Sequence, residues 1–189
     1  MYTHAEILIN KKMIEVEAKA KIMDVNSFLE KAGKIGKFNG KEKKIDDYYT
    51  LESKRAYPQK SLRIRKRKGR YEINFKKRIS SFNKVQAKKE TEFFVSDIDN
   101  FLYLIRDFGF KKWLRKEKET WLFEIKKNFH IEINKVKSLG WFVEVEYLCD
   151  NANIHMARKY VEKIMKTMGI SRKNYIKEGY TKMLWEKMN

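Results

Sequence analysis

The stretch Met13-Ile14-Glu15-Val16-Glu17-Ala18-Lys19-Ala20-Lys21 alternates between apolar and charged residues from Ile14 onward. Successive side chains of a β-strand point to opposite faces, so the stretch predicts a strand with one apolar face and one wholly charged face. A charged strand face is usually the solvated side of a sheet. The alternation returns further along the chain, which argues for a different role.

Four later segments repeat the alternation with other charges. Their charged or polar positions are Arg63, Arg65 and Arg67; Glu72, Asn74 and Lys76; His130, Glu132 and Asn134; and Glu144 and Glu146. If these faces turn to a common side, carboxylates lie opposite a group of arginines and lysines. Grouped carboxylates bind hard divalent cations, and Arg and Lys bind phosphate oxygens. The predicted ligand of such a surface is a polyphosphate bridged by a metal ion.

These segments, in this order, resemble the CYTH superfamily of triphosphate tunnel metalloenzymes, which includes class IV adenylyl cyclases, thiamine triphosphatases and inorganic triphosphatases. Glu15-Val16-Glu17-Ala18-Lys19 is similar to the family's ExExK signature, and the resemblance runs from about residue 13 to 184. The other similar segments are Leu62-Arg63-Ile64-Arg65 (the LRIR strand), Ile73-Asn74-Phe75-Lys76 (LTYK), residues 116–121 (K-x-R-x-x-Y), residues 133–146 (LDxVxxLGxFVEIE) and residues 179–184 (sYxxLL).

The 189 residues are enough for one domain with a sizeable core. The patterns predict an α+β fold of about eight antiparallel strands, with a helix after the first strand, one in the middle and two at the end. The resemblance implies a closed antiparallel β-barrel, whose charged interior forms a triphosphate tunnel and whose apolar outer face is covered by flanking helices. Residues 1–10 are predicted to be a short N-terminal extension, and 11–189 a single CYTH-like domain.

Three segments carry weaker patterns. Residues 34–44, which are rich in Gly and Lys, predict a loop before a strand that begins at Ile45. Residues 110–118 and 119–126 predict two separate strands. A final helix is predicted from about Ser171 and includes residues 179–184.

The resemblance implies one or two Mg2+ or Mn2+ ions as cofactors. Their predicted ligands are Glu15, Glu17, Asn134, Glu144 and Glu146. Glu17, Glu144 and Lys76 are the predicted catalytic residues. At the position of Asn134 the family usually has Asp. An amide oxygen can ligate a cation but brings no charge, so weaker binding of one metal ion or a changed activity is expected. The alternative is that the carboxylates only form ion pairs with the basic strands.

The resemblance also implies phosphate binding by basic residues of the tunnel. The predicted set is Lys19, Arg63, Arg65, Lys76, Lys89, Lys116 and Lys118. Arg offers forked donors that can bind two phosphate oxygens, whereas Lys is a compact charge. Lys118 stands where the family has Arg, a change that keeps the charge and loses the fork.

By its length and its segment 140–147, the chain looks most like the class IV adenylyl cyclase branch, which implies conversion of ATP to cyclic AMP and pyrophosphate. Two alternatives remain open at this point. One is a triphosphatase that hydrolyses inorganic, nucleoside or thiamine triphosphate. The other is a non-catalytic binder of polyphosphate or RNA, which Asn134 and the net charge of +19 both permit.

Other features narrow the partners and the location. Trp113 and Trp121 flank a basic run without a second aromatic platform, so nucleic acid is possible as a partner but not favoured. No apolar run is long enough to cross a bilayer, which predicts a cytoplasmic protein without a membrane partner. The histidines are too scattered to form a site, and His130 is predicted to be structural.

Overall fold

The computed structural model describes residues 14–53, 55–67 and 69–189, except for the side chains of residues 67, 76–81, 86, 88–90 and 151. The predicted extension, residues 1–10, therefore lies outside the described residues. So do the side chains of Lys76 and Lys89, and the site roles predicted for them stay predictions. The assignment of residues 11–189 to a single domain also stays a prediction.

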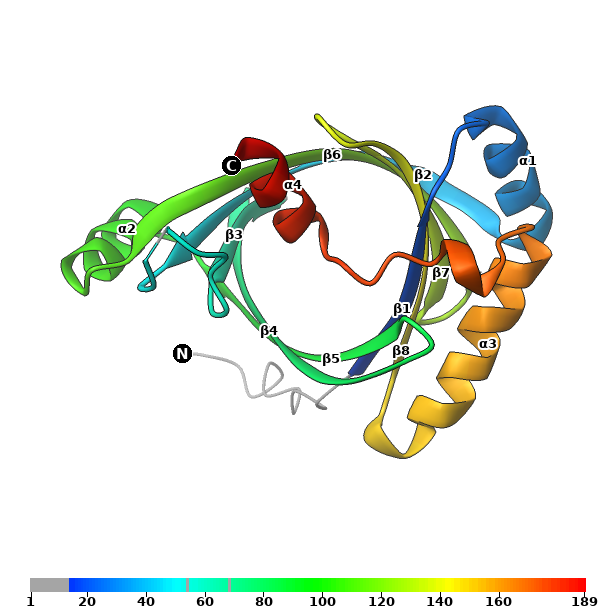
Figure 1. The fold of residues 1–189 in the computed structure, drawn as a ribbon. Coiled ribbons are helices and arrows are strands. Elements are labelled where there is room, and N and C mark those ends of the chain that lie inside the picture. Colours follow the sequence, from blue (N-terminus) through cyan, green and yellow to red (C-terminus); the bar gives the residue numbers. More distant parts are fainter. Residues whose placement is uncertain (1–13, 54, 68) are drawn as a thin grey trace.

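Eight antiparallel strands and four α-helices form the described chain (Figure 1), so the predicted α+β class is confirmed. The strands are β1 (Ile14–Lys21), β2 (Lys37–Thr50), β3 (Leu62–Arg67), β4 (Arg70–Phe82), β5 (Val85–Val95), β6 (Lys111–Lys126), β7 (Phe129–Val136) and β8 (Gly140–Cys149). The helices are α1 (Val25–Ile35), α2 (Ile98–Asp107), α3 (Ile154–Thr167) and α4 (Tyr180–Met188), with short 3-10 helices at Asn151–Asn153 and Arg172–Asn174. Within the described residues, no helix has both the length and the apolar character needed to span a bilayer.

The strands pair in the order β1-β5-β4-β3-β2-β6-β7-β8, and β1 also pairs with β8, so the order closes on itself as a barrel. β1 pairs with its two neighbouring strands over different lengths. Along β8 all eight residues of β1 are paired, whereas along β5 only the first four are. Beyond them, Ala20 forms a bridge with Tyr175, and the Ile176 N–H donates to the Lys19 carbonyl at 2.8 Å. The C-terminal segment therefore continues the pairing where β5 leaves β1.

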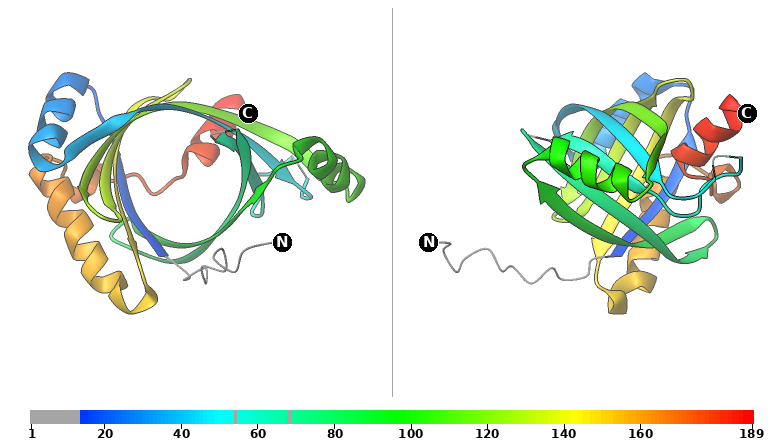
Figure 2. Two further views of the ribbon diagram at one scale, coloured as in Figure 1. Left: turned by 180° about the vertical axis from the view of Figure 1, so that it is seen from behind. Right: turned by 90° about the vertical axis from the view of Figure 1, so that its left-hand side faces the viewer.

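The hydrophobic core lies outside the ring, between the strands and the helices. Val16 and Ala20 of β1 are fully buried on the outer face, in one cluster with Val161 and Met165 of α3. A second cluster joins Ile64 of β3 to α2 on the opposite side of the ring (Figures 1 and 2). Burying an aliphatic side chain contributes about 1.5–3 kcal/mol. The helices thus stabilise the apolar outer face, and the charged face of each strand is left for the interior.

Two of the predicted connections are wrong. The loop expected over residues 34–44 belongs mostly to the long strand β2, and the two strands expected over 110–126 are the single strand β6, with which β2 pairs. The pattern around Lys41 to Lys44 contains no apolar residue because one face of β2 points into the cavity and the other to solvent. Alternation of apolar and polar residues cannot reveal a strand whose two faces are both polar.

The C-terminal part also differs from the prediction. The expected helix from Ser171 is wrong in its first half: after the 3-10 helix Arg172–Asn174 the chain runs extended, and α4 begins only at Tyr180. This extended segment crosses one mouth of the ring on its way from α3 to α4 (Figure 1). At the end of this segment, the Thr181 hydroxyl in the first turn of α4 lies 2.8 Å from the Tyr57 hydroxyl in the loop between β2 and β3.

Candidate functional site in the barrel cavity

The ring of strands encloses a cavity of about 640 Å3, a volume typical of sites for small organic ligands. Every charged strand face found in the sequence contributes to its lining, so the prediction that these faces turn to a common side is confirmed. The charged and amide side chains that line it are Glu15, Glu17, Lys19, Lys44, Gln59, Arg63, Arg65, Glu72, Asn74, Glu92, Lys116, Lys118, His130, Glu132, Glu144 and Glu146.

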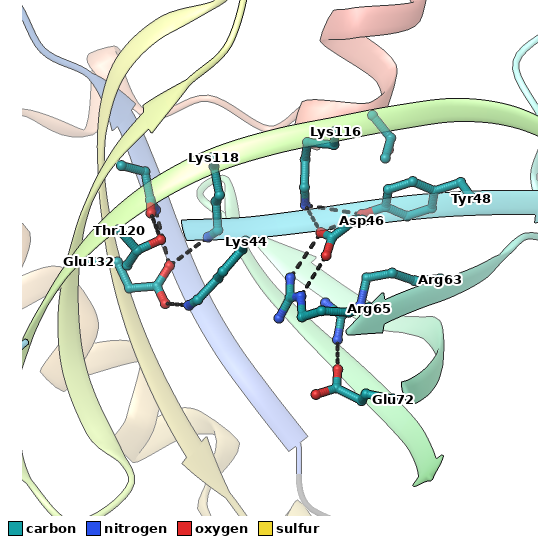
Figure 3. Close-up of polar contacts among 12 residues, drawn as sticks. Lys44, Asp46, Tyr48, Arg63, Arg65, Glu72, Lys116, Lys118, Thr120 and Glu132 are labelled. Atoms are coloured by element: carbon teal, nitrogen blue, oxygen red, sulfur yellow. Dashed lines mark hydrogen bonds and ion pairs between the residues drawn. The ribbon is translucent and has the colours of Figure 1, made fainter. Parts of the chain in front are cut away.

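Asp46 is the centre of a basic group on one wall of the cavity (Figure 3). The Arg65 guanidinium donates to it through Nε at 2.5 Å and Nη2 at 2.9 Å, and the Lys116 ammonium lies 2.9 Å away. This group forms because β2 lies between β3 and β6, with Asp46 opposite both Arg65 and Lys116. Asp46 is fully buried, and although burial alone would raise its pKa, Lys116 and Arg65 hold that pKa well below its usual range.

Glu132 is the centre of a second ionic group, formed with lysines. Its two carboxylate oxygens lie 2.7 Å from the Lys118 ammonium and 2.8 Å from the Lys44 ammonium (Figure 3). Glu144 lies nearby, 3.6 Å from Lys19 and 3.7 Å from Lys118. Burial alone would raise the pKa of Glu132, but Lys118 and Lys44 hold it well below its usual value. The negative charge of Glu132 is therefore compensated within the protein.

Glu15, Glu17 and Glu146 form a third group, here called the carboxylate cluster. Glu17 and Glu146 are opposite each other on β1 and β8, and one oxygen from each of the three carboxylates lies within 4.8 Å of the others. Burial and then the neighbouring charge of Glu15 raise the pKa of Glu146, in contrast to Glu132. Crowded carboxylate oxygens are the donor set that Mg2+ and Mn2+ prefer, so these residues fit a divalent ion.

His130 lies at the edge of the carboxylate cluster, with Nε2 3.5 Å from the Glu146 carboxylate. Burial alone would lower the pKa of His130, but the interaction with Glu146 raises it. His130 was predicted to be structural, and the structure places it in the cavity wall.

Asn134 is fully buried and lies between the ionic groups. Its side-chain nitrogen donates to Glu132 at 3.1 Å and to Glu144 at 2.7 Å, and its side-chain oxygen accepts the hydroxyl of Thr120 at 2.6 Å. Of the five predicted metal ligands, the structure thus brings three together in the carboxylate cluster. Glu144 and Asn134 bond to each other instead.

A family model for the CYTH domain matches residues 13–180. The chain belongs to the CYTH family. A protein of Methanocaldococcus jannaschii that bears the name "Putative adenylate cyclase MJ0240" is 30% identical in an alignment 179 residues long, which covers 90% of this chain and 98% of that protein.

Solved structures resemble this CYTH domain over nearly its whole length. The PH1819 protein of Pyrococcus horikoshii is 26% identical, with a TM-score of 0.75 over 92% of this chain and 99% of its own. A Hippeastrum protein, for which a dominant triphosphatase activity is described, is 14% identical with a TM-score of 0.61 over 88% of this chain and 91% of its own. At that identity the likeness shows the fold alone.

The site predicted for this CYTH chain omitted several residues of the cavity wall, among them Lys44, Glu132 and Tyr180, and also the buried Asp46 that pairs with Arg65 and Lys116. Glu132 shares a strand face with Asn134, so the alternation alone could have found it. Lys44 was assigned to a loop, which hid its direction. Tyr180 enters the cavity from the C-terminal segment, far in sequence from the strands, and only the fold brings it there.

The Tyr180 ring covers the basic wall of the cavity. The ammonium groups of Lys19, Lys116 and Lys118 lie 4.6, 5.8 and 5.9 Å from its centroid. Burial, and then the Glu144 and Glu132 carboxylates, raise the pKa of its hydroxyl well above the usual value, so the side chain stays neutral. An aromatic face attracts cations, and Tyr180 therefore helps to hold three neighbouring ammonium groups in one wall.

Proposed function

We propose that this CYTH protein binds the triphosphate group of its substrate inside the barrel and acts on it with a divalent ion, Mg2+ or Mn2+. The observation that supports this most is the division of one cavity into a cluster of carboxylates and a wall of arginines and lysines. Phosphoryl and nucleotidyl transfer need mainly positioning and charge stabilisation from a protein, and this cavity offers both.

In this proposal Glu15, Glu17 and Glu146 hold the ion, which neutralises charge on the phosphate oxygens when bound. Arg63 and Arg65 of β3 and Lys116 and Lys118 of β6 bind phosphate, together with Lys19, which lies beside the carboxylates on β1. Asp46 keeps Arg65 and Lys116 in fixed positions before substrate enters, which lowers the entropic cost of binding. Lys76 and Lys89 stay candidates for the same wall.

The first candidate reaction is conversion of ATP to cyclic AMP and pyrophosphate. The ribose 3'-hydroxyl loses its proton and its oxygen bonds to the α-phosphorus, while the bond from that phosphorus to the pyrophosphate oxygen breaks. The basic wall would stabilise the negative charge that develops on pyrophosphate. The name of the M. jannaschii relative supports this reaction. Glu17 and Glu144 are its candidate catalytic carboxylates.

The second candidate reaction is hydrolysis of a triphosphate, in which the oxygen of water bonds to the terminal phosphorus while the bond from that phosphorus to the bridging oxygen breaks, releasing orthophosphate and the diphosphate. The activity described for the Hippeastrum protein supports it, because that protein has the same fold. Both reactions would use the same wall and the same carboxylates; they differ in which phosphorus lies beside the ion.

The test is to incubate the purified protein with Mg2+ or Mn2+ and either ATP or tripolyphosphate, and to separate the products. Cyclic AMP with pyrophosphate would establish the cyclase, and orthophosphate would establish the triphosphatase. If neither substrate turns over with either ion, the non-catalytic polyanion binder becomes the favoured function, and its affinity should then fall steeply with salt and need no metal.

Tyr180→Leu is expected to weaken tripolyphosphate binding about 5- to 30-fold, because about 1–2 kcal/mol of cation–π attraction is lost in a desolvated site. Tyr180→Phe keeps the ring and should bind nearly as the wild type does. Calorimetric titration of both variants, with circular dichroism as a check on folding, measures this. Equal weakening in both variants would mean that the hydroxyl, not the aromatic face, is responsible.

A further inference from the structure

The orientation of the Asn134 amide follows from the chemistry of its neighbours. Ionised carboxylates only accept hydrogen bonds, so the amide nitrogen, which donates, must face Glu132 and Glu144. The amide oxygen then faces the Thr120 hydroxyl, which donates to it at 2.6 Å. The reverse orientation would set a carbonyl oxygen against two carboxylates and leave buried donors unsatisfied. The oxygen of Asn134 is therefore turned away from these carboxylates.

The charges around Asn134 lead to the same conclusion. Glu132 and Glu144 lie beside three ammonium groups, those of Lys44, Lys118 and Lys19, at 2.7 to 3.7 Å. A divalent cation placed there would add two positive charges to a group that already has more ammonium than carboxylate groups. Beside this group, the carboxylate cluster has the opposite imbalance, since its three carboxylates share one small space, although a ligand atom of its Glu146 lies within 4.8 Å of one of Glu132.

We infer that Asn134 is a positioning residue that reserves Glu132 and Glu144 for lysines, so that the protein without substrate binds one divalent ion, in the carboxylate cluster. The inference rests on the proposed function, from which the ion comes. The neutral amide lets two carboxylates approach one nitrogen atom without a cation between them. Asp at this position would remove both hydrogen bonds and leave three carboxylates in contact, an arrangement that a cation would stabilise.

The experiment counts Mn2+ ions bound in the absence of substrate, by calorimetry and by electron paramagnetic resonance of the free ion. The wild type is expected to bind one ion and Asn134→Asp two. Without metal, Asn134→Asp should unfold at a lower temperature than the wild type, and Mn2+ should raise its Tm more than that of the wild type. The matched control is Asn74→Asp, which adds the same charge to the cavity wall on β4 and should leave the count at one.

Two Mn2+ ions on the wild type would overturn the inference, and this count needs no variant. A count of one for Asn134→Asp, or of two for Asn74→Asp, would overturn it as well. If the wild type turns over a triphosphate but holds two ions, only the inference fails. If the wild type binds no ion and has no turnover, the proposed function fails with it.

Discussion

Asp46→Asn is expected to destabilise the fold by about 3–5 kcal/mol, because it leaves buried cations without their counter-charge. Asp46 is fully buried and bonds to Arg65 through two nitrogens and to Lys116 through one. The substitution keeps the shape of the side chain and removes the carboxylate that contacts both cations. Urea denaturation at pH 7 measures the loss of the free energy of unfolding.

Asp47→Asn is the matched control, one residue away on the other face of β2. Asp47 pairs with Lys112 and Arg115, whose side chains are 40% and 52% exposed, so its loss is expected to cost only about 0–1 kcal/mol. Equal destabilisation by the two substitutions would contradict the role given to Asp46.

The loss of free energy of unfolding in Asp46→Asn, relative to the wild type, is expected to depend on pH in one direction. The pKa of Asp46 is lowered in the folded protein, so its stabilising contribution is present above the unfolded pKa of about 3.9 and is lost as pH falls through the folded value. The gap in free energy of unfolding between wild type and Asp46→Asn should therefore be constant from about pH 5 to 8 and shrink in stronger acid. A gap that grows in acid would contradict the assignment.

The strands that line the cavity could largely be predicted from the sequence by one rule: the apolar residues of each strand lie on its outer face, against the helices, and the residues between them point inward. Val16 and Ala20 must be buried, and the alternation then sends Glu15, Glu17 and Lys19 inward. The rule failed at β2 around Lys44, where neither face is apolar. It also failed beyond Ser171, where the segment is fixed by pairing with β1 and not by its own periodicity.

The grouping of the carboxylates could not be predicted, because it depends on which strands are neighbours. The sequence offers Glu17, Glu144 and Glu146 as equivalent candidates. The closed order of strands brings Glu17 next to Glu146, whereas Glu144 meets Lys118 of β6 and Asn134 of β7. Glu132 takes its second ammonium from Lys44, 88 residues earlier in the chain. Periodicity within a strand gives the face of a residue but not its partner across the barrel.

Glu17→Gln is expected to lower turnover about 100- to 1000-fold, since losing part of the metal's charge stabilisation costs about 3–4 kcal/mol of activation free energy. The variant should also bind Mn2+ more weakly. Its fold should be as stable as the wild type without metal, because the substitution removes charge from a crowded carboxylate cluster. Turnover, Mn2+ titration and thermal unfolding of the same preparation separate these effects.

Glu92→Gln is the matched control, because it makes the same change of charge in the same cavity, on β5, outside the carboxylate cluster. It should keep most of the turnover and all of the Mn2+ affinity. If Glu17→Gln instead keeps or gains affinity for tripolyphosphate, with no need for metal, the cavity acts as a general polyanion site. If only Glu17→Gln loses turnover and Mn2+ binding, the negative charge of Glu17 is needed at its own position in the carboxylate cluster. Non-specific attraction of polyanions to a protein of net charge +19 would not depend on that position.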